Sequence, residues 1–104
     1  MSVLQGVLFE EIERLERVIS NYKEKLSSLP RGSIFVRKMG KSSFVYRKRK
    51  ENGAVISEYL GNFDDQEVKK QIELSEEYKR VKQNIRSASM ELEKLKRAYK
   101  VYDW

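Results

Sequence analysis

The chain has 104 residues, of which 39% are hydrophobic and 37% are charged, and its formal net charge is +6 at pH 7. It contains no cysteine and no histidine, which excludes disulfides, thiolate metal sites, cysteine nucleophiles and histidine-based catalysis. The high charged fraction leaves little apolar material for a compact core, which favours an elongated helical protein or an oligomer. We expect one domain over residues 1–104, located in the cytoplasm, with no membrane-spanning segment.

An amphipathic helix is predicted over residues 3–29. Its apolar residues recur in alternating steps of four and three, the heptad pattern of a coiled coil. We call this apolar stripe the seam. Its first half comprises Leu8, Ile12, Leu15, Ile19, Tyr22, Leu26 and Leu29. Pro30 ends the helix, because the residue before a proline is driven out of the α-helical region.

A three-stranded antiparallel meander is predicted over residues 33–61. Here the hydrophobic period changes from seven to two, and β-branched and aromatic residues become frequent. Asn52-Gly53 is typical of a two-residue hairpin turn, since both residues tolerate positive φ. A first turn is expected around Met39-Gly40. The predicted partners are Lys50 with Val55, Lys48 with Ser57, Arg47 with Glu58, Tyr46 with Tyr59, and Phe35 with Phe44.

This register divides the meander into two chemically different faces. One face is aliphatic and suits packing on the helices; it carries Ile34, Val36, Val45, Ile56 and Leu60, with Arg47 paired to Glu58. The other face interleaves aromatic rings with cations; it carries Phe35, Phe44, Tyr46 and Tyr59 with Arg37, Lys48 and Lys50. The second face is therefore either a ligand surface or a structural contact with the helices or with a second subunit.

A second, longer helix is predicted over residues 64–102. Asp64 is the expected N-cap, Glu67 completes a capping box, and Phe63 with Val68 forms a hydrophobic staple. Because this start pattern accounts for the adjacent carboxylates of Asp64 and Asp65, we interpret them as capping groups and not as metal ligands. The heptad seam continues through Leu74, Tyr78, Val81, Ile85, Ala88, Leu92, Leu95, Tyr99 and Tyr102.

The predicted fold is α+β and mainly α, with two long antiparallel coiled-coil helices flanking the three-stranded antiparallel β-meander. The seam residues expected to pair are Ile12, Leu15, Ile19, Tyr22, Leu26, Val81, Ile85, Leu92, Leu95 and Tyr99. Two helices alone leave the seam edges exposed, so a homo-oligomer, with a dimer favoured, is expected. An elongated monomer is the alternative, because a heptad pattern does not distinguish pairing within one chain from pairing between chains.

The excess positive charge lies in the meander. Residues 31–61 hold eight basic and two acidic residues, whereas residues 1–30 hold four and five and residues 62–104 hold ten and nine. Cations interleaved with aromatic rings suit phosphate neutralisation combined with base stacking or groove insertion. The leading hypothesis is therefore a non-enzymatic module that binds DNA or RNA.

In this hypothesis the meander residues fall into three roles. Arg37, Lys48 and Lys50 contact phosphates, Phe35, Tyr46 and Tyr59 stack or insert, and Arg31, Lys41 and Arg49 add attraction at the rim. The alternative is a protein-interaction or scaffolding module that self-associates through its helices. No catalytic constellation, metal site, cofactor, small-molecule substrate or membrane contact is predicted, and the glycines are spaced as turn residues and not as a phosphate cradle.

Three motifs in and before the meander carry a resemblance. They are Leu29-Pro30-Arg31-Gly32-Ser33, Phe44-Val45-Tyr46-Arg47 and Ile56-Ser57-Glu58-Tyr59-Leu60-Gly61. This pattern resembles a set of short uncharacterised bacterial and phage proteins, in which a Leu-Pro-x-Gly-Ser start and a Tyr-Leu-Gly ending lie between charged helices. That family has no assigned activity, so the resemblance implies a fold and not a function. The meander is also similar to the N-terminal segment of some insertion-sequence transposases and to the arm-binding domains of tyrosine recombinases, which lay a sheet against DNA; the long flanking helices depart from that likeness.

Overall fold

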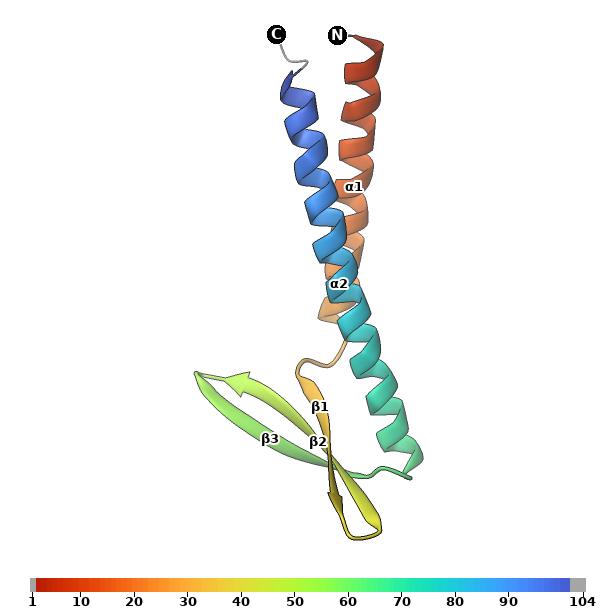
Figure 1. The fold of residues 1–104 in the computed structure, drawn as a ribbon, viewed down its shortest axis with the longest axis vertical. Coiled ribbons are helices and arrows are strands. Elements are labelled where there is room, and N and C mark those ends of the chain that lie inside the picture. Colours follow the sequence, from red (N-terminus) through yellow and green to blue (C-terminus); the bar gives the residue numbers. More distant parts are fainter. Residues whose placement is uncertain (1, 102–104) are drawn as a thin grey trace. The chain divides into compact units, whose positions relative to one another are not determined.

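The computed structural model describes residues 2–101. In chain order its elements are α1 (Val3–Ser27), β1 (Ser33–Met39), β2 (Ser42–Glu51), β3 (Ala54–Asn62) and α2 (Gln66–Val101), as Figure 1 shows. The predicted α+β class, with two long helices flanking a three-stranded antiparallel sheet, is confirmed. Coiled-coil packing of the helices stays a prediction, and Tyr102, the predicted end of the second helix, lies outside the described residues.

The chain divides into two compact units. The helical unit consists of residues 1–28 and 80–104, and the sheet unit consists of residues 29–79. Helix α2 therefore contributes its first part to the sheet unit and its second part to the helical unit.

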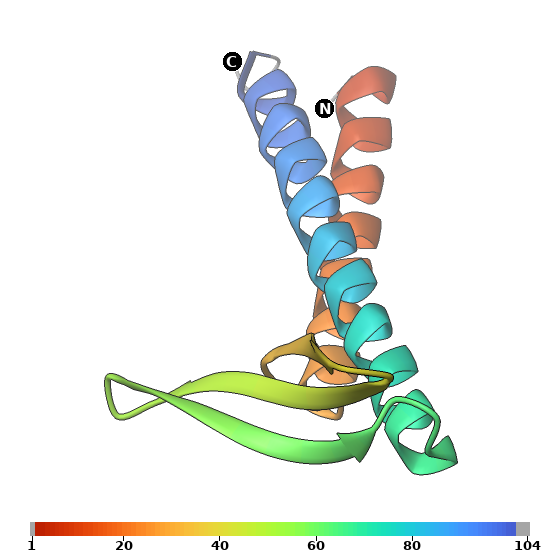
Figure 2. The same cartoon turned by 60° about the horizontal axis from the view of Figure 1, so that its bottom comes forward.

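In the helical unit, α1 and the second part of α2 lie antiparallel, side by side (Figures 1 and 2). The core consists of Leu15, Ile19 and Ala88, with Leu92 and Leu95 packed against it. The rings of Phe9 and Tyr99 lie 6.2 Å apart between centroids. Early residues of α1 thus meet late residues of α2, which is the antiparallel arrangement that the sequence predicts.

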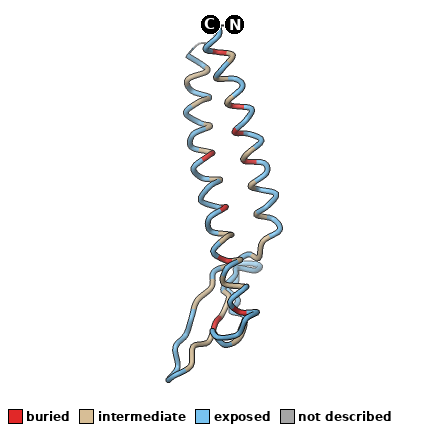
Figure 3. The backbone as a smooth tube through the Cα atoms, turned by 90° about the vertical axis from the view of Figure 1, so that its right-hand side faces the viewer, coloured by how far each residue is buried: buried red, intermediate tan, exposed pale blue. Residues whose placement is uncertain are grey.

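The predicted seam residues lie on the inner sides of these helices. Figure 3 shows the buried positions recurring along both helices. Ile12, Leu15, Ile19, Val81 and Ala88 are buried, while Tyr22, Leu26, Ile85, Leu92, Leu95 and Tyr99 are half-buried. Helix α1 ends at Ser27, two residues before the predicted end, and Ser2 caps its start by accepting a 3.0 Å hydrogen bond from the Gln5 N–H.

In the sheet unit the strand order is β1-β2-β3, with both pairs antiparallel. The turn between β2 and β3 has positive φ at both central residues, 51° at Asn52 and 81° at Gly53, as the hairpin signal requires. The predicted partners across this turn are confirmed, from Lys50 opposite Val55 to Tyr46 opposite Tyr59. A register shift between Val45 and Tyr46 then places Val45 opposite Gly61.

The predicted register across the first turn is wrong by two residues. Phe35 pairs with Tyr46, and Phe44 pairs with Arg37. The two residues between the strands are Gly40 and Lys41, with Gly40 at a φ of 63°, so the turn lies one residue later than predicted. Because the pairing shifts by an even number of residues, every side chain stays on the face that the sequence assigned to it.

Helix α2 begins at Gln66, so its predicted start at residue 64 is also wrong. Asp65 is the N-cap: its Oδ1 accepts a 2.8 Å hydrogen bond from the Glu67 N–H, and its carbonyl accepts the first helical bond, from Lys69. The Asn62 side chain accepts from the Asp64 N–H at 3.0 Å. This side-chain turn holds Asp64 outside the helix and moves the cap to the next carboxylate.

The first part of α2 packs on the face of the sheet that was predicted to be aliphatic. Val45 is fully buried on that face, and Val68 of α2 is 2% exposed. Any Cβ at position 61 would lie 2.8 Å from a methyl carbon of Val68. Arg47 Nη2, on the same face, donates a 2.7 Å hydrogen bond to Gln71 Oε1 of α2.

Helix α2 covers only part of the aliphatic face. The predicted pair between the Arg47 and Glu58 side chains does not form. The guanidinium of Arg47 turns to the helix, and Glu58 instead pairs with Arg49 at 3.1 Å. Val36 and Ile56 of the aliphatic face remain 48% and 37% exposed. The face therefore divides into a part under α2 and a part open to solvent.

Candidate nucleic-acid interface

The face of the sheet away from α2 carries a continuous chain of four aromatic rings, here called the ring face. Phe35 and Tyr46 stack with centroids 5.2 Å apart and ring planes 14° apart. Tyr46 meets Tyr59 at 5.4 Å, and Tyr59 meets Phe44 at 6.2 Å, both tilted. The chain crosses all three strands because the register sets Phe35, Tyr46 and Tyr59 in one row.

The rings differ in how open they are to a ligand. Tyr59 is 55% exposed, whereas Phe35, Phe44 and Tyr46 are half-buried. The face of Phe35 is engaged by Tyr46 and by the Lys48 ammonium, which lies 5.1 Å from its centroid. Three rings were predicted to stack on a ligand, and Tyr59 is the most accessible of them. Tyr46 packs against the Tyr59 ring, and Phe35 packs against Tyr46 in turn.

Three cations lie on the ring face, as predicted from the register. Arg37, Lys48 and Lys50 are exposed, and within residues 2–101 no carboxylate forms an ion pair with any of them. Arg37 lies in the row of Phe44, and Lys48 lies opposite Ser33. At ~3.3 Å per residue, Arg37 and Lys48 are thus separated by roughly 13 Å along the strands, with the row of Phe35 and Tyr46 between them.

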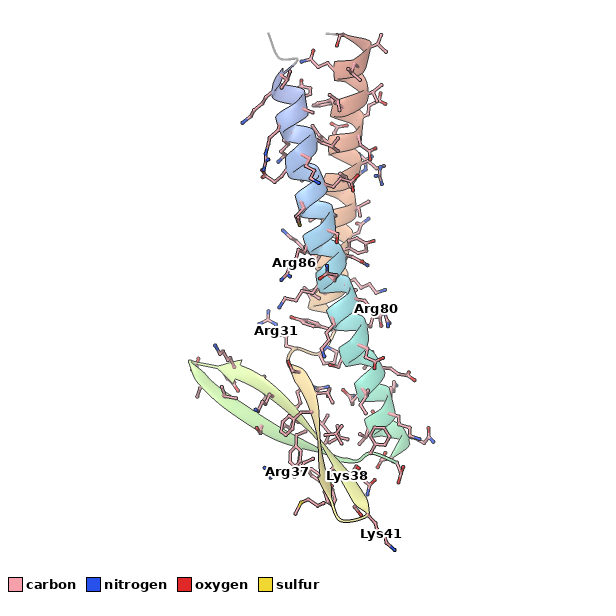
Figure 4. The ribbon with its side chains drawn as sticks, in the orientation of Figure 1. Arg31, Arg37, Lys38, Lys41, Arg80 and Arg86 are labelled. Carbon is pink, nitrogen blue, oxygen red and sulfur yellow. The ribbon has the colours of Figure 1, made fainter. Side chains whose placement is uncertain are left out.

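The three predicted rim cations lie either on the other face or beyond the ends of β1. Arg49 sits opposite Ile56 on the other face, where Glu58 at 3.1 Å and Glu51 at 3.6 Å neutralise it. Arg31 precedes β1 and Lys41 lies in the turn after it, so they stand at opposite ends of that strand (Figure 4). Lys38 points to the opposite side of β1 from its neighbour Arg37 (Figure 4). The register therefore places Arg37, Lys48 and Lys50 on the ring face, whereas Arg49 lies on the other face and Arg31 and Lys41 lie beyond the two ends of β1.

A buried stripe on the first part of α2, which meets the sheet through Val68 and Gln71, was not predicted from the sequence; Val68 was assigned only to a staple with Phe63. Val68 and Ser75 are buried, and Gln71 and Ile72 are half-buried. Their spacing of three and four residues forms a second stripe on α2, offset from the seam that begins at Leu74. The longer heptad pattern that begins at Leu74 dominates the periodicity of α2, so this shorter stripe was overlooked. The helical spacing of the stripe was nevertheless a detectable signal.

The negative charge of the sheet unit lies on its helical side. Residues 62–79 hold six acidic and three basic residues. Because the first part of α2 packs on the other face of the sheet, these carboxylates belong to the layer behind the ring face. The unit is thus polarised, with unpaired cations in front and an acidic helix behind.

Two further site classes find no support in the described part of the chain. Over residues 2–101 no helix is both long enough and apolar enough to cross a membrane. In the same range no group of three or more acidic side chains is arranged to hold a metal ion.

Comparison with known proteins gives one match. Residues 12–70, more than half of the chain, match the family described as a domain of unknown function (DUF6788). No curated protein and no solved structure matches the chain.

Proposed function

The chain belongs to the DUF6788 family, which has no known function, and from the geometry of its sheet unit we propose that it binds nucleic acid through the ring face. The proposal is for a binding module without catalytic activity. Arg37, Lys48 and Lys50 contact phosphates, and Tyr59 contacts bases or sugars. A self-associating scaffold that binds no nucleic acid is the alternative, and the experiment below separates the two.

One observation carries the proposal: unpaired cations flank a chain of aromatic rings on a sheet face that α2 leaves open. Cations without carboxylate partners are free to replace the counterions of a phosphate backbone. Arg49, which has two carboxylate partners, shows that the chain neutralises a cation elsewhere on the same sheet. The spacing of roughly 13 Å between Arg37 and Lys48 is close to the ~12 Å width of a major groove.

The test measures affinity for a mixed-sequence duplex of about 30 base pairs and for its single strands, as DNA and as RNA. Three phosphate contacts predict that duplex affinity falls about 40-fold between 50 and 200 mM salt. The triple variant Arg37→Gln, Lys48→Gln, Lys50→Gln is expected to lose both the affinity and most of this salt dependence.

The matched control is Arg17→Gln, Lys23→Gln, Lys100→Gln, which removes the same charge from exposed positions of the helical unit. It is expected to retain binding. Equal losses in both variants would show only general charge attraction and contradict a ring-face site. No binding by the wild-type chain at 50 mM salt would contradict the proposal and leave the scaffold alternative.

A second variant separates the aromatic contact from the charge. Tyr59→Ala is expected to weaken single-strand binding by about 1–3 kcal/mol without changing its salt dependence, because stacking is not electrostatic. Val55→Ala is the control, since Val55 is 60% exposed on the same face and has no ring. Equal affinities of the Tyr59→Ala variant and the wild type would exclude stacking and leave a purely ionic contact.

A further inference from the structure

The chain of rings on the ring face ends at an edge of the sheet. The strand order is β1-β2-β3, so Tyr59 of β3 lies on an edge strand, and residues 54–59 of that strand are all exposed. Both ring neighbours of Tyr59, Tyr46 at 5.4 Å and Phe44 at 6.2 Å, belong to β2. Within residues 2–101 no strand pairs with the outer side of β3. The ring chain is therefore open to a further planar group at Tyr59.

The rings behind Tyr59 are already engaged. Tyr46 has a ring on each side, since Phe35 stacks on it with centroids 5.2 Å apart and Tyr59 meets it from the other strand. Phe35 is half-buried and also meets the Lys48 ammonium, 5.1 Å from its centroid. Tyr59 is 55% exposed. A planar ligand can thus stack on Tyr59 without displacing the contacts of Phe35 or Tyr46.

Unpaired cations lie on both sides of the row that contains Tyr59. Arg37 is one row away on one side, and Lys48 and Lys50 are one and two rows away on the other. Successive rows on one face of a sheet are two residues apart, roughly 6.6 Å at ~3.3 Å per residue. This spacing is comparable with the separation of consecutive phosphates along a nucleic-acid strand. The phosphates on either side of a nucleotide stacked on Tyr59 therefore come within reach of cations.

The positions of the cations suit a duplex as well as a single strand, so the rings decide between the two. In a duplex each base is stacked between its neighbours and shows only its edges in the grooves. Stacking of one unpaired base on an aromatic ring strengthens binding about 5- to 150-fold. A duplex base has to be unpaired and unstacked first, which weakens binding by a similar or larger factor. Only an already unpaired base gains from the open ring of Tyr59.

We infer that the ring face selects nucleic acid with unpaired bases, and that one such base stacks on Tyr59 at the open edge of the sheet. The flanking phosphates bind Lys48 and Lys50 on one side and Arg37 on the other. This inference rests on the proposed function, because it specifies which class of nucleic acid the same face binds. The shared chemistry is an unpaired base on a sugar–phosphate backbone, which single-stranded DNA and RNA both supply.

The test compares strands that have equal charge and differ in their bases. The probes are a thymidine deoxyoligonucleotide, a uridine ribo-oligonucleotide and an abasic strand, each about 12 nucleotides long, a length within the range of single-strand sites. Fluorescence anisotropy at ~50 mM salt, where phosphate contacts are strong, gives their affinities for the full chain. At least one base-bearing strand is expected to bind about 5- to 150-fold more tightly than the abasic strand.

Variants assign this gain to one ring. Tyr59→Ala is expected to remove the difference between base-bearing and abasic strands and to leave the affinity for the mixed-sequence duplex unchanged. Tyr59→Phe is expected to keep the difference, because it keeps the ring. Phe63→Ala is the matched control, since Phe63 is 42% exposed in the same unit and does not belong to the ring face. Circular dichroism verifies that each variant is folded.

The outcomes separate this inference from the proposed function. Equal affinities for base-bearing and abasic strands overturn the inference and leave phosphate binding by the ring face intact. A difference that survives Tyr59→Ala, or an equal loss of duplex and single-strand binding in that variant, also overturns it. A gain for thymidine, for uridine or for both supports it and shows which sugar is accepted. Absence of binding to every probe, duplex included, contradicts the proposed function itself.

Discussion

Two glycines are held in backbone conformations and surroundings that exclude a side chain. Gly32 has a φ of 104°, and a Cβ there would collide with the backbone carbonyl of Lys48. Gly61 has a φ of 141°, and its Cβ would lie 2.8 Å from a methyl carbon of Val68. Both glycines were predicted to be turn residues, and both lie in the motifs that carry the resemblance. The structure adds that Gly32 allows the close approach of β2 at Lys48, and that Gly61 allows the close approach of α2 at Val68.

We therefore predict that Gly32→Ala and Gly61→Ala each destabilise the sheet unit by roughly 1–3 kcal/mol, through positive-φ strain and steric overlap. Gly40→Ala is the control, because Gly40 also has positive φ but has nothing within 4 Å of a Cβ. The loss of stability is measured by urea unfolding, with hydrogen exchange of the strand amides as the readout. If Gly32→Ala costs no more than Gly40→Ala, the close approach to Lys48 does not matter to stability.

Helix α2 serves two units with two different stripes. Its seam meets α1 in the helical unit, whereas Val68 and Gln71 meet the sheet in the sheet unit. The heptad pattern predicts the first stripe only, since that stripe is longer and more regular. The start of the helix matters to the second stripe, because Asp65 caps the turn that presents Val68 to Gly61.

The N-cap assignment predicts a difference between two adjacent carboxylates. Asp65→Ala is expected to destabilise the protein by about 1 kcal/mol, because it removes the acceptor of the Glu67 N–H. Asp64→Ala is expected to cost only a few tenths of a kcal/mol, since only its backbone N–H takes part in the turn. Chemical denaturation monitored by circular dichroism compares them. A larger loss in Asp64→Ala would show that the helix starts earlier.

At the scale of the whole molecule, the distribution of charge depends on how the chain is divided. Counted along the sequence, the excess of +6 lies in residues 31–61. Counted by the two units, eleven basic and eight acidic residues fall in each, a net charge of +3 in both. The sheet unit is thus distinguished by the separation of its charges between the ring face and α2, and not by a larger net charge.

The homo-oligomer expected from the heptad pattern predicts a stability that depends on protein concentration. If two copies associate, the thermal midpoint is expected to rise by about 3 °C for each tenfold increase in protein concentration, because association favours the folded state by mass action. Circular dichroism melts at ~5, ~50 and ~500 μM measure this, and a constant wild-type midpoint would contradict pairing.

Features set by near neighbours in the chain were predictable. The heptad residues predicted the inner sides of both helices, and Asn52-Gly53 predicted its hairpin and the partners of Arg47 and Tyr46. The division of the sheet into a ring face and an aliphatic face survived an error of two residues in the first turn, because strand parity depends only on even or odd offsets. The same even-or-odd rule places the four rings and the three cations of the candidate site on one face.

The partners of individual side chains were decided only by the tertiary structure. Arg47 and Glu58 face each other in the register, yet Arg47 binds Gln71 and Glu58 binds Arg49. Long side chains can reach several polar groups, so the cross-strand neighbour is only one of their possible partners. Which sheet face α2 covers, and hence which cations remain unpaired, depends in the same way on packing between distant segments. The sequence by itself determined the elements and their faces, since these follow from local spacing; the structure decided which face is open, since that depends on contacts across the fold.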